Sequence, residues 1–445
     1  MTTNTLILGA KIINEGNIIE SDVYLKNGRI ASIGSHRPEE KHNEVRAEGL
    51  YLMPGIIDDQ VHFREPGYTQ KADIHTESRA AAAGGVTSFM EMPNTKPVAT
   101  DLLRLEEKYN IARQSSYTNY SFFLGASTDN LDQIQQMDPE RICGIKIFMG
   151  SSTGDLLVDD DRALENIFRE SPTLIATHCE DEAMFRARLQ EYKVKFCDHI
   201  PASSHEFIRS KEGCLLSSSK AVHLARKFGS RLHILHISTA EELALFPNDL
   251  PLLQKKITSE VCVHHLYFDA SDYATLENKI KCNPSIKSAY HRKALFEGLL
   301  EDRLDIIATD HAPHLLSEKI GGYLQSASGL PLVQHALVIM LDFYHQGKIS
   351  LEKLVTKMCH APADCFKIRE RGYIREGYHA DLVLLDPNEP GLITKENIFY
   401  KCGWSPLEGK QFRGRVVSTW VNGFPVYDQS GFGLTGRGQR LLFDR

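Results

Sequence analysis

The sequence predicts an α/β protein: a (β/α)8 barrel, the TIM-barrel architecture, joined to a small β-domain formed by the N- and C-terminal segments. In the middle of the chain, apolar strand-like runs alternate with stretches of helical periodicity, a pattern that indicates a parallel sheet. Both ends carry short β-rich runs with hairpin turns, and neither end could bury a core alone. We therefore expect a barrel at residues 53–377 and a sandwich-like β-domain at residues 1–52 and 378–445.

Apolar runs supply the expected barrel strands, and their number, eight, is what a closed barrel needs. They are residues 55–62, 86–93, 120–126, 143–149, 173–180, 231–238, 258–265 and 304–311. Helical patterns lie at residues 102–115, 161–170, 203–226 and 292–301. An open doubly wound sheet is the alternative, but no glycine-rich phosphate loop follows the first strand to support a nucleotide-binding version of it.

The terminal segments read as short strands. The N-terminal runs are residues 5–8, 23–25 and 29–33, and Asn27-Gly28 signals a hairpin between the last two. The C-terminal runs are residues 380–385 and 416–421, and Asn422-Gly423 follows the second as another hairpin signal. Pairing of the two ends into one domain is the simplest way to bury both.

Composition narrows the functional class. The chain has 445 residues, 42% hydrophobic and 24% charged, with a formal net charge of -7, which argues against a nucleic-acid partner. No run approaches the ~18 apolar residues of a membrane span, and the N-terminus lacks the pattern of a signal peptide. The nine cysteines are scattered without C-x-x-C spacing, which argues against a disulfide framework or a zinc ribbon. We expect a cytoplasmic protein that acts on a small molecule.

Charged or metal-capable side chains gather at the C-terminal ends of the expected strands, the rim where barrel active sites are built. They are His62, Arg64, Asn94, Lys146, His178, His236, Asp310 and His314. A single histidine at a strand end is more often a structural, hydrogen-bonded residue, and an acid after an apolar run can cap a helix. So many at one rim nevertheless predict a functional site. Other histidines are interpreted as structural: His75, His205, His223, His233, His264, His265 and His291.

Lys146 is the most informative of these residues. It lies in the apolar run GIKIF, and lysine is almost never fully buried without a partner. A neutral lysine amine that captures CO2 becomes a carbamate, whose two oxygens can bridge a pair of metal ions, and burial favours the neutral amine. Imidazoles and carboxylates bind zinc, which activates water near neutral pH. The sequence therefore predicts one or two Zn²⁺ ions per chain and a CO2-derived carbamate on Lys146.

Several segments resemble motifs of the dihydroorotase family, in the cyclic amidohydrolase branch of the amidohydrolase superfamily. They are PGIIDDQVHFREPG at residues 54–67, MPNTKP at 92–97, DHAPH at 310–314, and KCGWSP with a following Glu-Gly at 401–409. The resemblance spans nearly the whole chain. It implies the reversible cyclisation of N-carbamoyl-L-aspartate to L-dihydroorotate, a step of de novo pyrimidine (UMP) synthesis, and a homodimer.

The resemblance also implies roles at the metal centre. One metal would be held by His62, carboxylated Lys146 and Asp310, and the second by the same carbamate with His178 and His236. A metal-bound hydroxide would be the nucleophile. Asp310 would act as the general base and acid, taking a proton from the bridging water and delivering it to the departing ring nitrogen.

Substrate contacts implied by the resemblance are Arg64, Asn94, Asn283 and His314. Arg64 suits a carboxylate because its planar guanidinium forms paired hydrogen bonds. The loop at residues 326–329 would offer backbone groups to the ring. Residues 150–154 are either a mobile loop over the substrate or a plain turn.

One departure from the family pattern is Gln60, which stands where the first strand usually carries the first histidine of His-x-His. A glutamine oxygen is a weaker zinc ligand than imidazole. Gln60 either ligates or only hydrogen-bonds, so the metal site shared by His62 and Asp310 either binds loosely or stays empty.

Two other functions remain open. A hydantoinase or allantoinase would share the metal ligands, but Arg64 and Asn94 argue against it because those substrates lack the same pendant carboxylate. A catalytically silent dihydroorotase-like scaffold for another pathway enzyme has Gln60 as its only support. Against the scaffold, the other predicted ligands are all present: Lys146, His178, His236 and Asp310.

Overall fold

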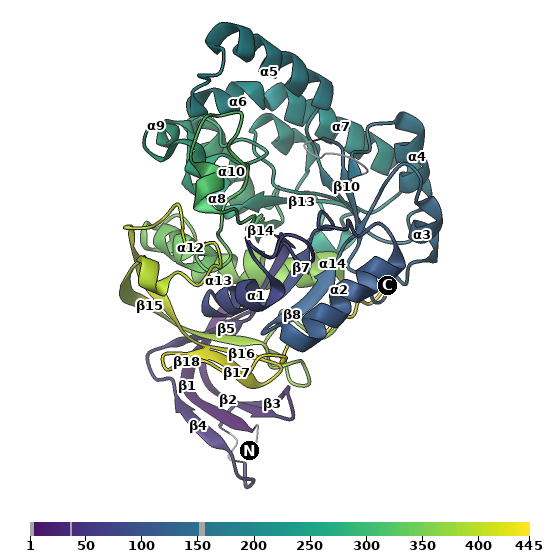
Figure 1. The fold of residues 1–445 in the computed structure, drawn as a ribbon. Coiled ribbons are helices and arrows are strands. Elements are labelled where there is room, and N and C mark those ends of the chain that lie inside the picture. Colours follow the sequence, from purple (N-terminus) through teal and green to yellow (C-terminus); the bar gives the residue numbers. More distant parts are fainter. Residues whose placement is uncertain (1–3, 36–37, 151–155) are drawn as a thin grey trace.

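A computed structural model describes residues 4–35, 38–150 and 156–445 of the chain. Figure 1 shows a barrel surrounded by helices, with a sheet made from both ends of the chain packed against one side. This arrangement confirms the predicted fold class. Apart from Gly150, the loop expected at residues 150–154 lies outside the described residues.

Each of the predicted barrel runs contains a parallel strand. Two sheets, β6-β7-β8 and β9-β10-β11-β12-β13-β14, form the wall, and β8 and β9 are the two halves of one predicted run. The wall closes where Val61 at the end of β6 bridges to His311. The strands are β6 (Ile56–Val61), β7 (Val86–Glu91), β8 (Asn119–Phe122), β9 (Leu124–Gly125), β10 (Ile145–Phe148), β11 (Ile175–His178), β12 (Leu232–Ile234), β13 (Ile257–Cys262) and β14 (Ile306–Ala308).

Helices surround the barrel, and most of them contribute buried residues, whereas α5 contains none. Two have the bounds that the sequence pattern predicts, and both begin after an aspartate whose side chain accepts a backbone N–H, Asp101 for α2 and Asp160 for α4. The helices are α1 (Ile74–Ala83), α2 (Leu102–Ser115), α3 (Leu131–Gln136), α4 (Asp161–Glu170), α5 (Glu182–Phe196), α6 (His205–Ile208), α7 (Lys211–Phe228), α8 (Val263–Tyr267), α9 (Tyr273–Leu276), α10 (Ala289–Leu300), α11 (Leu316–Lys319), α12 (Ala336–His345), α13 (Leu351–Val355) and α14 (Ala361–Phe366). A π-helical turn (Thr356–His360) joins α13 to α14, and short 3-10 turns lie at Ala202–Ser204, Glu241–Leu245, Leu252–Gln254, Ala270–Asp272, Glu277–Ile280 and Lys395–Asn397.

The prediction of one long helix at residues 203–226 is wrong, because the structure divides this stretch between α6 and α7. The chain leaves helical geometry at Arg209, and Ser210 then caps α7 by accepting the N–H of Gly213. Helical periodicity continues across the break, so the pattern alone did not reveal it. The break directs the buried Arg209 side chain to Glu180 at the end of β11.

The seventh predicted strand also ends earlier than expected. β13 stops at Cys262, and the next residues begin the short helix α8. His264 and His265 therefore lie on a helical turn at the barrel rim and not on a strand. The turn brings both rings close to Cys262, with ring centroids 4.2 Å apart.

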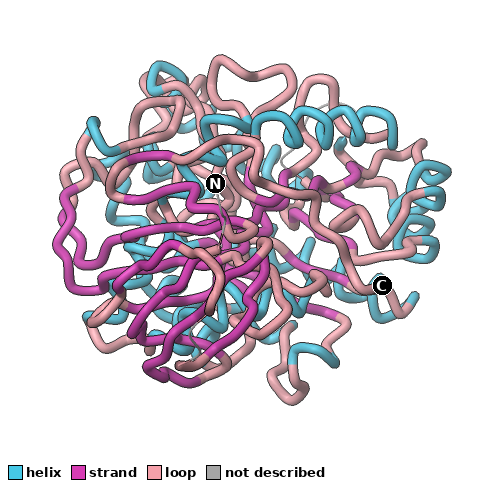
Figure 2. The backbone as a smooth tube through the Cα atoms, turned by 90° about the horizontal axis from the view of Figure 1, so that it is seen from below, coloured by secondary structure: helices cyan, strands magenta, loops and turns pink. Residues whose placement is uncertain are grey.

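The chain ends form one sheet, as predicted, with the order β18-β17-β16-β15-β5-β1-β2-β3 and β4 paired to β1. In the view from below its strands lie side by side across one side of the molecule (Figure 2). The bounds are β1 (Thr5–Asn14), β2 (Asn17–Lys26), β3 (Arg29–Ile33), β4 (Asn43–Arg46), β5 (Tyr51–Pro54), β15 (Leu382–Leu392), β16 (Gln411–Val421), β17 (Phe424–Asp428) and β18 (Gly431–Phe432). The domain boundaries at residues 52/53 and 377/378 stay predictions.

The main core lies between the barrel and its helices and fixes the strand ends in space. Phe63, directly after β6, is fully buried and packs on Phe89 of β7 with ring centroids 4.4 Å apart. Ile145 and Ile147 of β10 are also fully buried in this core. Among the described helices, none combines the length and the apolar character needed to cross a lipid bilayer.

Candidate active site

The predicted site residues line one cavity of about 190 Å³ at the C-terminal ends of the barrel strands. Its lining includes every side chain predicted to bind metal or substrate or to act in catalysis: Gln60, His62, Arg64, Asn94, Lys146, His178, His236, Asn283, Asp310 and His314. Phe148, Ala312, Ser328 and Gly329 complete the wall. The barrel thus brings together side chains from residue 60 to residue 314.

On one side of the cavity, His178 and His236 face each other with Nδ1 and Nε2 2.9 Å apart. The other nitrogen of His178, Nε2, lies 2.9 Å from a Glu180 carboxylate oxygen, which Arg209 holds at 2.7 Å. Because Glu180 accepts the Nε2–H, the lone pair of His178 sits on Nδ1 and points at His236. Such outer hydrogen bonds fix the tautomer and orientation of a metal-binding histidine.

On the opposite side, His62 Nε2 lies 3.1 Å from Asp310 Oδ1. Asn94 Oδ1 is 2.8 Å from His62 Nδ1, so it accepts the Nδ1–H and leaves the Nε2 lone pair for the cavity. Gln60 donates its Nε2–H to the same Asp310 oxygen at 3.2 Å. In this structure Gln60 therefore hydrogen-bonds to a predicted ligand.

Lys146 lies between these two sides with an exposed fraction of only 1%. Its amine makes no hydrogen bond to a described residue and lies 4.4 Å from the centre of the Phe148 ring. Burial lowers the pKa of Lys146 to about 7. Burial also lowers the pKa values of His62, His178 and His236, so their imidazoles are neutral near pH 7.

Three residues at this rim have a strained backbone. Arg64, His236 and Asp310 adopt left-handed φ angles of 68°, 40° and 44°. Residues other than glycine rarely hold this geometry, and such strain gathers at functional sites. The strained backbone turns these side chains at the point where each strand ends.

Two cationic side chains, Arg64 and Lys71, lie at the corner beyond Asp310, and Lys71 is paired with the Glu318 carboxylate at 2.7 Å. Lys71 Nζ lies 3.1 Å from His314 Nδ1, and His314 Nε2 lies 3.0 Å from the Ser328 carbonyl oxygen. Lys71 therefore donates to Nδ1, and Nε2–H donates to Ser328. Arg64 reaches the same histidine, with Nη2 3.1 Å from Nε2 and Nε–H donating to the Pro313 carbonyl at 3.1 Å. Burial, helped by these neighbouring cations, holds the pKa of His314 far below its usual value.

Buried lysines fix the loop that closes this corner. Lys319 Nζ donates to the carbonyl oxygens of Lys281, Ala327 and Gly329 at 2.7–3.0 Å. Lys281 Nζ donates to the carbonyls of Tyr323 and Ser326 at 2.6 Å. The loop at residues 326–329 is thereby anchored against the segment that carries Asn283.

Comparison with known proteins identifies the family. Residues 51–426 match the sequence profile of the amidohydrolase family. A dihydroorotase from Pyrococcus abyssi is 31% identical over 98% of both chains, and an allantoinase from Bacillus velezensis is 30% identical over 97% of this chain and 95% of its own.

The chain belongs to the amidohydrolase family.

Among solved structures, the L-hydantoinase of Arthrobacter aurescens superposes on this amidohydrolase with a TM-score of 0.93, covering 99% of this chain and all of its own. At 24% sequence identity that likeness concerns the fold. Dihydroorotases and allantoinases are both cyclic amidohydrolases. This amidohydrolase is accordingly a hydrolase that acts on a cyclic amide.

The cavity of the amidohydrolase fits a metal centre. Its donors are neutral imidazoles on both sides, a carboxylate, and a buried amine without a hydrogen-bond partner among the described residues. An amine in such a place is costly unless it is modified or bound. Carboxylation of Lys146 would turn this orphaned group into an anion that both sides share.

Sequence reasoning missed the residues that stand behind the cavity wall. Glu180 ends the fifth predicted strand, so the strand-end argument that selected His178 could have found it. Lys71, Arg209 and Lys319 carried no such signal, because their roles depend on turns and loops brought together by the fold.

Proposed function

We propose that this amidohydrolase is a dihydroorotase, which interconverts N-carbamoyl-L-aspartate and L-dihydroorotate in pyrimidine synthesis, with Zn²⁺ as its metal. The Arg64 guanidinium, which lines the cavity beside His314, carries this proposal. L-Dihydroorotate is a cyclic amide with a pendant carboxylate, so its recognition needs a fixed positive charge beside the metal centre. An arginine guanidinium is the side chain best suited to that task.

The position of the corner supports the proposal. Arg64 follows β6, the same strand that supplies His62, and His314 follows Asp310 at the end of the barrel. A substrate carboxylate bound in this corner would place the substrate ring beside the side chains of His62 and Asp310. Asn94, whose Oδ1 is engaged by His62, would have its amide hydrogens for the same carboxylate.

Each residue then has a chemical task. His62 and Asp310 would hold one Zn²⁺, His178 and His236 the other, and carboxylated Lys146 would serve both. When bound, the metals would polarise the ring amide and activate water. Asp310 would take the proton from the attacking water and deliver it to the ring nitrogen as the C–N bond breaks. One carboxylate can do both because the proton it gains in the first step is the one the departing nitrogen needs.

Substitution of Arg64 tests the choice of substrate. Dihydrouracil is the same ring without the carboxylate, so it serves as a matched substrate. We expect Arg64→Met to lower kcat/KM for L-dihydroorotate about 10²-fold, the value of one charge-assisted hydrogen-bonded contact, while any activity on dihydrouracil is unchanged. Arg64→Lys keeps the positive charge but loses the planar guanidinium, so its kcat/KM for L-dihydroorotate should lie between those of the wild type and Arg64→Met.

Equal loss on both substrates would mean that Arg64 supports the fold and not the carboxylate. A wild-type enzyme that opens allantoin or hydantoin rings and refuses dihydroorotate would replace the proposal with the hydantoinase or allantoinase alternative. Metal-loaded protein that refuses all of these rings would leave the silent scaffold.

The resemblance also predicts a homodimer, and the composition predicts a cytoplasmic enzyme. Light scattering on the purified protein would test the first of these predictions. Fractionation of the source cells would test the second.

A further inference from the structure

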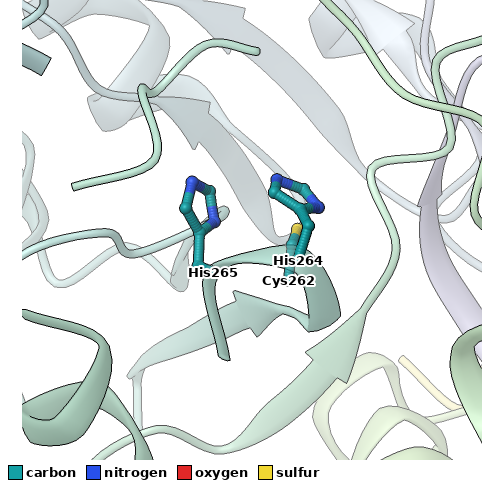
Figure 3. A group of neighbouring side chains, drawn as sticks. All are labelled: Cys262, His264 and His265. Carbon is teal, nitrogen blue, oxygen red and sulfur yellow. The ribbon is translucent and has the colours of Figure 1, made fainter. Parts of the chain in front are cut away.

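Beside the active-site cavity lies a second group of metal-capable side chains. Cys262 ends β13, and His264 and His265 lie in α8, which begins at the next residue. Their ligand atoms lie within 4.8 Å of one another, and all three residues are buried. Figure 3 shows the two imidazole rings side by side above the turn, with the Cys262 sulfur next to His264.

The two histidines are unusually poor in hydrogen bonds for buried groups. Neither ring nitrogen of His264 makes a hydrogen bond of good geometry to a described residue, although the Thr309 backbone lies close enough to affect its pKa, and Nδ1 of His265 is also without a partner there. His265 Nε2 lies 3.1 Å from the Pro284 carbonyl oxygen and donates to it, so the His265 lone pair is on Nδ1. Burial lowers the pKa of His264 to about 4 and that of His265 as well, which keeps both rings neutral. Unsatisfied buried nitrogens of this kind are rare and call for a partner.

Gln60 links this group to the cavity. Because its Nε2 donates to Asp310, its carbonyl oxygen points the other way and lies 3.6 Å from Cys262 Sγ. Two ligands of one tetrahedral zinc ion, a sulfur at ~2.3 Å and an oxygen at ~2.1 Å, would be about 3.6 Å apart. A Glu260 side-chain oxygen lies 3.8 Å from the same sulfur.

We propose that Cys262, His264 and His265 form a zinc site, with the Gln60 side-chain oxygen as the fourth donor, separate from the metal centre at Lys146. One thiolate and two imidazoles are a donor set that favours zinc over magnesium or calcium. The open cavity at Gln60 gives the ion a route to this buried position. Gln60 would then serve as a zinc ligand of this second site, at the position where the dihydroorotase motif has a histidine. The proposal does not depend on which cyclic amide the enzyme opens.

The sulfur ligand provides a direct test, because the centre predicted at Lys146 holds only nitrogen and oxygen donors. The full-length enzyme would be stripped of metal and titrated to saturation with Co²⁺. We expect a thiolate-to-cobalt charge-transfer band in the near ultraviolet. Cys262→Ser should lose the band and bind one metal fewer per chain by elemental analysis. Cys143→Ser, a matched change at a buried cysteine outside both sites, should keep both properties.

A second variant guards against misfolding of the first. His265→Asn keeps the thiol but removes one nitrogen donor, and it should also bind one metal fewer per chain and lose the band. The proposal is overturned if saturated wild-type protein shows no thiolate band, or if the band survives in Cys262→Ser. Neither readout involves turnover, so failure here is distinct from failure of the dihydroorotase proposal.

Discussion

The two sides of the active-site cavity differ both in their donors and in what supports them, since one side presents two imidazoles and the other presents one imidazole and a carboxylate. His178 is held by Glu180, which is held in turn by Arg209, and all three side chains are buried. His62 is held by the neutral amide of Asn94, and its neighbour on the strand is Gln60 in place of a histidine. A carboxylate behind a histidine raises its basicity more than an amide does. The comparison predicts a tightly held metal at His178 and His236 and a weaker one at His62 and Asp310.

The largest expected effect is the loss of kcat on substitution of Asp310, which is proposed both to bind metal and to transfer the proton. We expect Asp310→Asn to lower kcat for ring opening by about 10²–10⁴-fold, because an amide cannot carry the proton from water to the ring nitrogen. Steady-state kinetics would measure the loss, with a thermal melt to confirm the fold. A kcat within about threefold of wild type would remove Asp310 from the reaction.

Glu180→Gln tests the side of the cavity at His178 and His236, where a carboxylate supports the histidine. It keeps the shape but loses the charge that orients His178, so affinity for the metal on this side should fall about 10–100-fold. Competition with a chelator would measure it. Glu212→Gln is the matched control, since Glu212 pairs with Arg188 at the surface, 3.1 Å away. Equal affinities in the two variants would show that Glu180 does not support a ligand.

Gln60→His probes the weaker side. An imidazole restores the usual ligand pair on β6 and should tighten the metal at His62 about tenfold, equivalent to about 1.4 kcal/mol. The same chelator competition should then show the two sides closer in affinity. If Gln60→His leaves the weakly held metal unchanged, the difference between the sides has another origin.

Lys146 lies between the two sides, and carboxylation of its amine should depend on pH. Its pKa is lowered to about 7, so the neutral amine accumulates as the pH rises through 7 and is lost below it. The neutral fraction rises from about a tenth at pH 6 to about nine tenths at pH 8. Carbon NMR of metal-free protein with labelled bicarbonate, at constant dissolved CO2, should show a carbamate signal rising over this range. The signal should be absent in Lys146→Arg. A rise only near pH 10 would mean that the amine is not desolvated.

Much of this architecture could be predicted because it rests on local patterns. The apolar runs that became β7 and β10 each contain a strand that begins directly after a glycine, and barrel geometry places strand ends at one rim. That argument put His62, His178 and Asp310 on one rim, and the structure places them around one cavity.

The support behind the rim could not be predicted in the same way. The break at Arg209 depends on Ser210 capping the next helix, while the helical period runs on unbroken through both residues. The anchoring of residues 326–329 by Lys319 depends on carbonyls from separate parts of the chain. His264 and His265 were interpreted as structural, because only the early end of β13 brings their rings beside Cys262.

The measurement that tests the central claim most directly is a side-by-side assay of purified, zinc-loaded wild-type enzyme on L-dihydroorotate, allantoin and a hydantoin. The metal content would be determined on the same sample. We expect the enzyme to open L-dihydroorotate with a kcat/KM at least about 10²-fold above that for the other two rings, as a dedicated carboxylate contact implies. Preference for allantoin or the hydantoin, or no turnover of any ring by metal-loaded protein, would contradict it.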